Sequence, residues 1–284
     1  MIIRRRAKGM MQRVRGKLLT AGRIFCQRGF RGIGSVTAQK IGMWYRRTGN
    51  AVRLDGCVFD LEGLSEDISG LLLRGEYELS ERTSARIFLD QRLPVIELGS
   101  CIGVVSCITN RMLQHPDRHV VLEANPNIIE TLRRNAARNR SCFTIVNAAL
   151  GYDASPFFVS NHLIASGTRA KGTPINVPKK TLRQIADEFQ FDRFTLVCDI
   201  EGSEIDLVDH EGDLIAERCP WVIMETHEKL LGMAPIRDMT ERLAQLGFSL
   251  THRAWDTSVF CNSLQKGDAN VTSRACDATQ FARN

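Results

Sequence analysis

The sequence predicts an α/β fold built on a mainly parallel sheet, and three observations support this. Short apolar runs of strand length alternate with amphipathic runs of helix length from residue 93 onward. A glycine-containing turn, Gly99 to Gly103, follows the first apolar run, and the carboxylate Glu123 ends the second. Strands separated by helices are joined by right-handed crossovers, which make neighbouring strands parallel.

The chain begins with a strongly basic leader. Met1 to Leu54 contains 14 Lys or Arg and no acidic residue. The rest of the chain therefore has 24 of the 38 basic residues and all 32 acidic residues, so its net charge is −8. Between Met10 and Phe30 apolar residues interleave with arginines, which predicts either an amphipathic helix on an anionic membrane surface or a solvated extension. An organelle transit peptide has a similar composition.

The overall composition is that of a globular protein, with 43% hydrophobic and 25% charged residues. No apolar run reaches the roughly 20 residues that span a bilayer, and the N-terminus does not resemble a secretory signal. We therefore expect a cytoplasmic protein, peripheral to the membrane if the leader binds one. The nine cysteines are odd in number and never spaced as C-x-x-C, which predicts neither a disulfide framework nor a zinc site.

The elements follow in order along the chain. Residues 51–61 alternate around Gly56 and predict a hairpin, and residues 79–89 predict a helix. Apolar runs then predict strands at 93–98, 119–123, 143–147, 194–199 and 221–225, and a closing pair at 248–252 and 258–261. The intervening helices are predicted at 104–113, 127–139, 181–189 and 236–246, and residues 151–178 are predicted to form a surface excursion.

The first two strands of the alternation carry residues suited to a nucleoside. Open α/β sheets bind ligands beyond the carboxyl ends of their strands. Gly99 and Gly103 allow close approach of the backbone, the next helix offers free N–H groups, and Glu123 can accept from both ribose hydroxyls. The fingerprint G-x-G-x-x-G is absent, which disfavours a nicotinamide dinucleotide. We expect an adenosine cofactor with a sulfonium, whose methionine ammonium Glu97 could bind.

A second group of polar residues ends the fourth and fifth strands. Asp199 and Glu201 are two residues apart, as are Glu225 and His227, so each pair can face one side of an extended chain. Three carboxylates and an imidazole at one sheet edge are costly unless they are paired, solvated or functional. Capping of the next helix, through Ser203, is the alternative explanation for part of this group.

These motifs, in their order and spacing, resemble the FkbM-type methyltransferase family over Gly75 to Cys261. The matching segments are GEYE at 75–78, ELGSCIG at 97–103, LEANPNIIETLRRNAARN at 122–139, VNAALG at 146–151, VPKKTLRQI at 177–185, CDIEGSEIDLV at 198–208 and IMETH at 223–227. The resemblance implies a doubly wound, Rossmann-like, seven-stranded sheet with an antiparallel terminal strand. It also implies S-adenosylmethionine as methyl donor and O-methylation of a sugar, glycan or secondary-metabolite hydroxyl.

The family pattern also implies roles for individual residues. The methionine half of the cofactor is assigned to Glu97, Gly99, Ser100 and Gly103, the ribose to Glu123, the adenine edge to Asn147 with Ala148, and the transferred methyl to Asp199 and Glu201. Cys101 stands where such enzymes usually have Gly or Asn, so this cofactor-binding position departs from the pattern. The domains are then a leader at 1–50, a methyltransferase domain at 51–264 with its cofactor core at 93–264, and a flexible tail at 265–284.

Methyl transfer to a hydroxyl benefits from a general base, and His227 is the candidate, with Glu225 or Asp199 orienting it. A histidine that is simply hydrogen-bonded at a strand end is the alternative. A divalent metal held by Asp199, Glu201 and Glu225 could instead lower the pKa of the acceptor, although a metal-free site is favoured.

Two other functions stay open at this stage. The basic leader could clamp phosphates for an RNA methyltransferase or a nucleic-acid-binding protein, but the acid-rich body and few aromatic residues disfavour nucleic acid as partner. A non-catalytic methyltransferase-like protein tethered by its leader is the third possibility. The sequence identifies neither the acceptor nor the oligomeric state.

Overall fold

The computed structural model describes residues 51–153, 157–159 and 173–265. The predicted basic leader and nearly all of the predicted tail therefore lie outside the described residues. No helix in the described ranges is long and apolar enough to cross a membrane. The seven cysteines within them are all free thiols.

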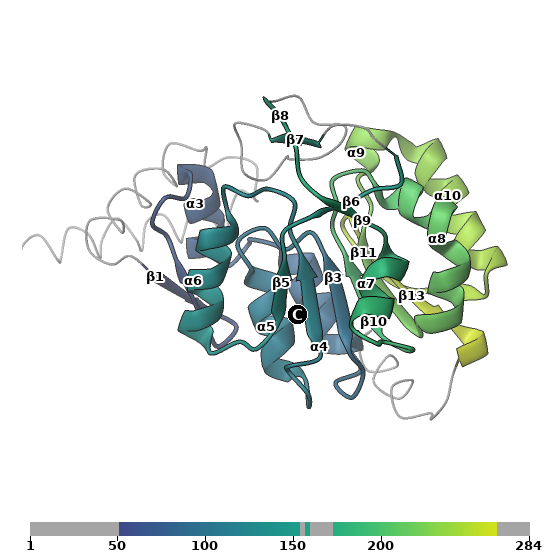
Figure 1. Cartoon of the computed structure of the whole chain (residues 1–284), viewed down its shortest axis with the longest axis horizontal. Coiled ribbons are helices and arrows are strands. Elements are labelled where there is room, and N and C mark those ends of the chain that lie inside the picture. The colour runs from purple at the N-terminus through teal and green to yellow at the C-terminus, as the bar shows by residue number, and fades with distance from the viewer. Residues whose placement is uncertain (1–50, 154–156, 160–172, 266–284) are drawn as a thin grey trace, which may run out of the picture.

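A seven-stranded sheet forms the centre of the fold, with the order β12-β13-β11-β10-β3-β4-β5 (Figure 1). Its parallel strands are β3 (Val95–Leu98), β4 (His119–Leu122), β5 (Thr144–Val146), β10 (Thr195–Cys198) and β11 (Trp221–Glu225). The closing strands are β12 (Phe248–Ala254) and β13 (Thr257–Asn262), and β13 runs antiparallel to β11. The prediction of a doubly wound seven-stranded sheet with antiparallel terminal strands is therefore confirmed.

The strand order reverses between β3 and β10. Along the chain, β3 is followed by β4 and β5 toward one edge of the sheet. The chain then returns to the other side of β3, where β10 and β11 extend the sheet toward the opposite edge. The connections that follow β3 and β10 therefore run toward opposite edges of the sheet. Doubly wound sheets bind ligands at this switch point, beyond the carboxyl ends of the two strands. The Gly99 turn follows β3 at this place, and Asp199 follows β10.

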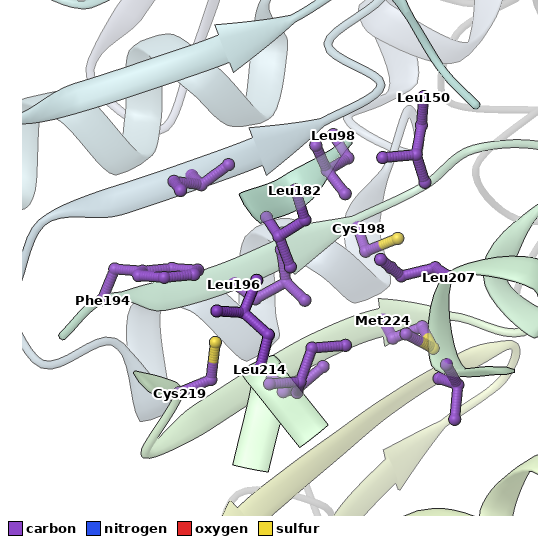
Figure 2. Close-up of a cluster of buried hydrophobic side chains, with 14 of the residues drawn as sticks. Leu98, Leu150, Leu182, Phe194, Leu196, Cys198, Leu207, Leu214, Cys219 and Met224 are labelled. Atoms are coloured by element: carbon purple, nitrogen blue, oxygen red, sulfur yellow. The ribbon is translucent and has the colours of Figure 1, made fainter. Parts of the chain in front are cut away.

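Helices cover both faces of the sheet (Figure 1). They are α3 (Glu66–Arg74), α4 (Leu79–Phe88), α5 (Val104–Met112), α6 (Ile129–Asn139), α7 (Leu182–Glu188), α8 (Glu204–Arg218), α9 (Glu228–Leu231) and α10 (Met233–Gln245). Figure 2 shows one core, in which Leu98, Leu196 and Met224 from strands meet leucines of α7 and α8. Two buried faces require strands that are apolar on both sides, which is why they appear as continuous apolar runs.

The hairpin predicted around Gly56 is present as β1 (Ala51–Leu54) and β2 (Cys57–Asp60). It packs on α6, where the Asn139 side chain accepts from the Val58 N–H at 2.7 Å and donates to the Val58 carbonyl at 2.8 Å. Arg82 of α4 is 2% exposed and pairs with Asp55 in the hairpin turn. The hairpin thereby fixes the N-terminal end of α4 beside the sheet.

Two regions differ from the sequence prediction. Helix α3 was not predicted, although Ser65 caps it by accepting from the Ile68 N–H at 3.3 Å. The predicted excursion at 151–178 contains regular pairing in its described parts, where β7 (Phe157–Val159) pairs antiparallel with β8 (Thr173–Ile175). Beside it, β6 (Ala149–Leu150) pairs parallel with β9 (Lys179–Lys180).

Candidate functional site

The glycine turn after β3 packs directly against the end of β10. Gly99 has a φ of +81°, and a Cβ atom there would lie 1.7 Å from the carbonyl oxygen of Asp199. Gly103 has a φ of +83°, and a Cβ atom there would lie 2.4 Å from the Leu132 side chain. Both positions therefore require glycine, because side chains fit neither the backbone conformation nor the space.

Glu123 lies against this turn, where the sequence places it. One carboxylate oxygen accepts from the Cys101 N–H at 2.7 Å and the other from the Asn125 N–H at 2.7 Å. Burial raises the pKa of Glu123 to about 7, although the backbone N–H groups that it accepts from oppose the change. The N–H groups of Ser100 and Ala124 also contribute, so Glu123 is the point where the ends of β3 and β4 meet.

The predicted adenine contacts lie one strand further along the sheet. Asn147 follows β5 and donates to the Glu123 carbonyl at 2.8 Å, which joins the ends of β5 and β4. Ala148 is 1% exposed. Their contact with an adenine ring stays a prediction.

Several buried polar atoms around the switch point have no hydrogen-bond partner among the described residues. They are Ser100 Oγ, Asn125 Nδ2, Glu78 Oε2 and Asp199 Oδ1. Native proteins leave few such atoms, and each one calls for an explanation. A ligand with several donors and acceptors along the turn would supply these partners, so the residues present fit an adenosine cofactor with an amino-acid arm.

Glu97 occupies a different environment from the one that its predicted role needs. It is 2% exposed, and Ser106 Oγ of α5 donates to one carboxylate oxygen at 2.5 Å. The other oxygen lies 3.2 Å from Nε2 of the buried His119. Both oxygens are thus engaged within the protein, and contact between Glu97 and a methionine ammonium stays a prediction.

The second predicted group does converge. His227 Nε2 lies 3.4 Å from Asp199 Oδ1, 3.4 Å from Glu201 Oε2 and 3.8 Å from Glu225 Oε1. These residues come from the loops after β10 and β11 and from the last position of β11. The parallel pairing of β10 and β11 brings them together, as the spacing predicted.

Glu204, at the start of α8, completes this group, and the sequence did not single it out. Its side chain is fully buried, and Oε1 lies 3.0 Å from His227 Nδ1. The same oxygen accepts from the Ile200 N–H at 3.0 Å. The prediction that Ser203 caps α8 with its side chain is wrong: Ser203 is the N-cap residue but makes no side-chain capping bond.

The carboxylates around His227 perturb one another. Burial alone would lower the pKa of His227, but the hydrogen bond and charge of Glu204, with the charges of Asp199 and Glu201, raise it to about 9. Burial raises the pKa of Asp199 well above its ordinary value, although the His227 charge opposes this. Burial and the charges of Asp199 and Glu81 raise the pKa of Glu225 to about 11.

A cavity of about 770 Å³ opens at this end of the sheet. It is lined by Leu71, Glu76, Tyr77, Glu78, Leu79, Ser80, Glu81, Asp199, Glu201, Glu225, Lys229, Trp255 and Asp256. Among these residues Lys229 alone carries a cationic side chain, so the wall is strongly acidic. His227 is not on the wall and lies behind Asp199 and Glu201 with 12% of its side chain exposed.

The N-terminal part of the wall was also missed by the sequence analysis. Glu81 of α4 is 4% exposed and accepts from Thr257 Oγ1 at 2.8 Å and from Ser80 Oγ at 3.1 Å. Glu78 and Glu201 adopt left-handed φ values of 46° and 51°, as does Cys101 at 45° in the glycine turn. Non-glycine residues in this conformation are uncommon, and such backbone strain concentrates at functional sites.

Two sets of ligating atoms lie close enough to share a cation. Asp199, Glu201 and His227 form one, and Glu81, Glu225 and Asp256 form the other, each with ligating atoms within 4.8 Å of one another. The metal ligands considered from the sequence were Asp199, Glu201 and Glu225. The structure places Glu225 in the second set, apart from Asp199 and Glu201. A divalent ion stays an untested alternative.

The chain matches one protein family and a set of solved structures. The model described as the methyltransferase FkbM domain matches residues 97–250. No curated protein matches significantly.

Solved structures with similar folds include the O-methyltransferase from Bacillus cereus in complex with SAH, at 10% identity, covering 81% of this chain and 92% of that chain with a TM-score of 0.40. M. jannaschii TYW2 in complex with AdoMet has 14% identity, 74% and 82% coverage and a TM-score of 0.39. The METTL16 MTase domain has 11% identity, 81% and 80% coverage and a TM-score of 0.45.

Proposed function

The chain belongs to the FkbM methyltransferase family, and we propose that it transfers a methyl group from S-adenosylmethionine to a hydroxyl oxygen of a small molecule or glycan. The observation that carries the proposal is the adjacency of two sites at the switch point of the sheet. The glycine turn with Glu123 is suited to the cofactor. The acidic cavity beside Asp199 is suited to the acceptor.

On the cofactor side, the chain supplies contacts without a phosphate cradle. The Gly99 turn lets the backbone approach the ligand, and the Glu123 carboxylate at the end of β4 accepts from the ribose hydroxyls. Asn147 and Ala148 border the adenine. When bound, S-adenosylmethionine supplies an electrophilic methyl carbon on a sulfonium, and Asp199 would lie beside it because the Gly99 turn packs against Asp199.

On the acceptor side, Asp199 and Glu201 face the cavity and His227 stands behind them. An acceptor hydroxyl therefore gives its proton to one of these carboxylates, which passes it to Nε2 of the neutral imidazole. S-adenosylmethionine held by the Gly99 turn and Glu123 would supply the methyl carbon to the acceptor oxygen, and its sulfur would keep the electron pair. His227 is thus the proton store of the site and the carboxylates are its contact with the acceptor.

The charge of the cavity favours a small, uncharged polyol over a nucleic acid. Six carboxylates besides Asp199 line the wall, namely Glu76, Glu78, Glu81, Glu201, Glu225 and Asp256. The ionised members would repel phosphate groups, whereas hydroxyl groups can hydrogen-bond to carboxyl groups in either protonation state. Trp255 is 73% exposed at the wall and offers a flat apolar surface against which a sugar ring can pack.

The experiment that tests this proposal follows methyl label from S-adenosylmethionine into pools of neutral glycans, phosphorylated sugars and RNA. We expect label in the neutral pool and loss of that label in D199N, with E228Q as a matched control because Glu228 pairs with Arg253 outside the cavity. Label in RNA alone would contradict the choice of acceptor. Label in none of the pools, with cofactor bound, would contradict the hydroxyl acceptor.

A further inference from the structure

We propose that Glu78 binds the ammonium group of the methionine half of the cofactor, the role that the sequence gives to Glu97. The inference rests on the proposed function, because it names a contact within that cofactor site. Both carboxylate oxygens of Glu97 already have partners inside the core, namely Ser106 and His119. A cationic group on the ligand therefore needs another carboxylate.

The backbone holds Glu78 in an unusual conformation. Glu78 is the N-cap residue of α4, yet it has a left-handed φ of 46° and its side chain makes no capping bond. On its N-terminal side, buried Arg82 donates to the Tyr77 carbonyl at 2.8 Å and to the Gly75 carbonyl at 2.7 Å. The segment that carries the Glu78 carboxylate is thus held in place by Arg82.

The same segment is fastened to the glycine turn. The Tyr77 hydroxyl donates to Cys101 Sγ at 3.2 Å. The charge of Glu78 contributes to the raised pKa of the Cys101 thiol, and the charge of Asp199 contributes to the raised pKa of Glu78. Tyr77 thus joins the segment to the turn, and Glu78 lines the same cavity as Asp199 at the end of β10, which is the space expected for the methionine half.

Inside the protein the Glu78 side chain is hydrogen-bonded by the uncharged Tyr77 side chain. Its Oε2 atom is buried and has no hydrogen-bond partner among the described residues. The strongest charge effects on it come from Glu81, Asp199 and Glu97, which are all acidic, and the cationic side chain on the cavity wall that it lines is that of Lys229. An ammonium group would provide both the missing donor and the missing charge, which is the usual way to stabilise a desolvated carboxylate.

The test compares two ligands that differ in the amino-acid arm. S-adenosylhomocysteine carries the ammonium, and 5′-methylthioadenosine keeps the adenosine and sulfur without it. By calorimetry, Glu78→Gln should weaken S-adenosylhomocysteine about ten- to hundredfold, the usual size of a charged hydrogen bond, and leave 5′-methylthioadenosine within about twofold. E76Q is the matched control, because Glu76 lines the same cavity but pairs with Arg74 at 2.6 Å.

Each result has a definite meaning. Equal weakening of both ligands in a folded E78Q protein, or no weakening of either, would overturn the role of Glu78. Failure of the wild-type protein to bind either ligand would overturn the proposed function itself.

A second measurement avoids substitution. Because burial raises the pKa of Glu78 and a neighbouring ammonium would lower it again, S-adenosylhomocysteine should release more protons on binding than 5′-methylthioadenosine across the pH range of the titration. Binding enthalpies in two buffers of different ionisation enthalpy measure this release. Equal proton release by the two ligands would contradict the proposal.

Discussion

Glu204 should control the titration of His227, and the structure gives the size of the effect. His227 has a pKa of about 9 in place of 6.5, and Glu204 contributes first among the groups that raise it. Asp199 and Glu201 contribute the rest. Replacing Glu204 by Gln keeps an oxygen for the Ile200 N–H but removes the charge, so the pKa of His227 should fall by at least about one unit, or about 1.4 kcal/mol.

The sign of the stability change follows from linkage. A histidine whose folded pKa exceeds its unfolded value stabilises the fold fully below pH 6.5, and this contribution is lost as the pH rises through 9. A rise from 6.5 to 9 corresponds to about 3 kcal/mol in the wild-type protein. In Glu204→Gln, the stabilisation lost as the pH rises should be smaller, and it should be fully lost at a lower pH. Groups that titrate alike in both proteins cancel when their free energies of unfolding are subtracted.

The assay is an NMR titration of the histidine ring signals, with His227→Asn to assign the resonance. E228Q is the matched control, because Glu228 neighbours His227 in sequence but pairs with Arg253. Urea unfolding at pH 6.5 and 9 supplies the stability difference. A His227 that titrates near 6.5 in the wild-type protein, or at the same pH in wild type and E204Q, would refute the reasoning.

Three further predictions concern the turn, the base and the anchor of α4. G99A should lower the free energy of unfolding by ~3 kcal/mol or more in urea titrations, because its Cβ would meet a carbonyl oxygen at 1.7 Å; G63A, with a φ of +77° but nothing within 4 Å, should cost only about 1 kcal/mol. A similar loss in both variants would show that strain alone matters. The kcat/KM for methyl transfer should rise about tenfold per pH unit below the pKa of His227 and level off near 9, because the imidazole must be neutral to take the proton; a flat profile would exclude it as the proton store. R82M should lower the free energy of unfolding by about 2–3 kcal/mol, because the Tyr77 and Gly75 carbonyl oxygens lose their donor while Asp55 retains Arg86, and an unchanged melting temperature would contradict this.

Much of the fold could be predicted because its signals are local. Each strand of the parallel sheet is apolar on both faces, so the runs at 95–98 and 195–198 stand out from their neighbours. Helix α3 was missed because it has nine residues, with Gly70 in its interior and an apolar segment too short to show a period. Its cap at Ser65 was the available signal.

The candidate site was predictable where parallel strands place residues and not where packing places them. Asp199 and Glu225 end neighbouring strands, so the sequence brings them to one edge. Glu81 reaches the same wall from α4, through tertiary contacts that local sequence does not encode. Glu204 was not singled out because acidic residues are common in the first turn of helices. Its burial against His227 depends on the left-handed turn at Glu201.

The central claim is that the switch point binds S-adenosylmethionine, and calorimetry of the purified protein with this ligand tests it most directly. The account predicts binding that Glu123→Ala abolishes, because Glu123 supplies the ribose contact and holds the glycine turn through Cys101. Circular dichroism of both proteins establishes that each is folded. The absence of binding to the folded wild-type protein, or equal binding to Glu123→Ala, would contradict the claim.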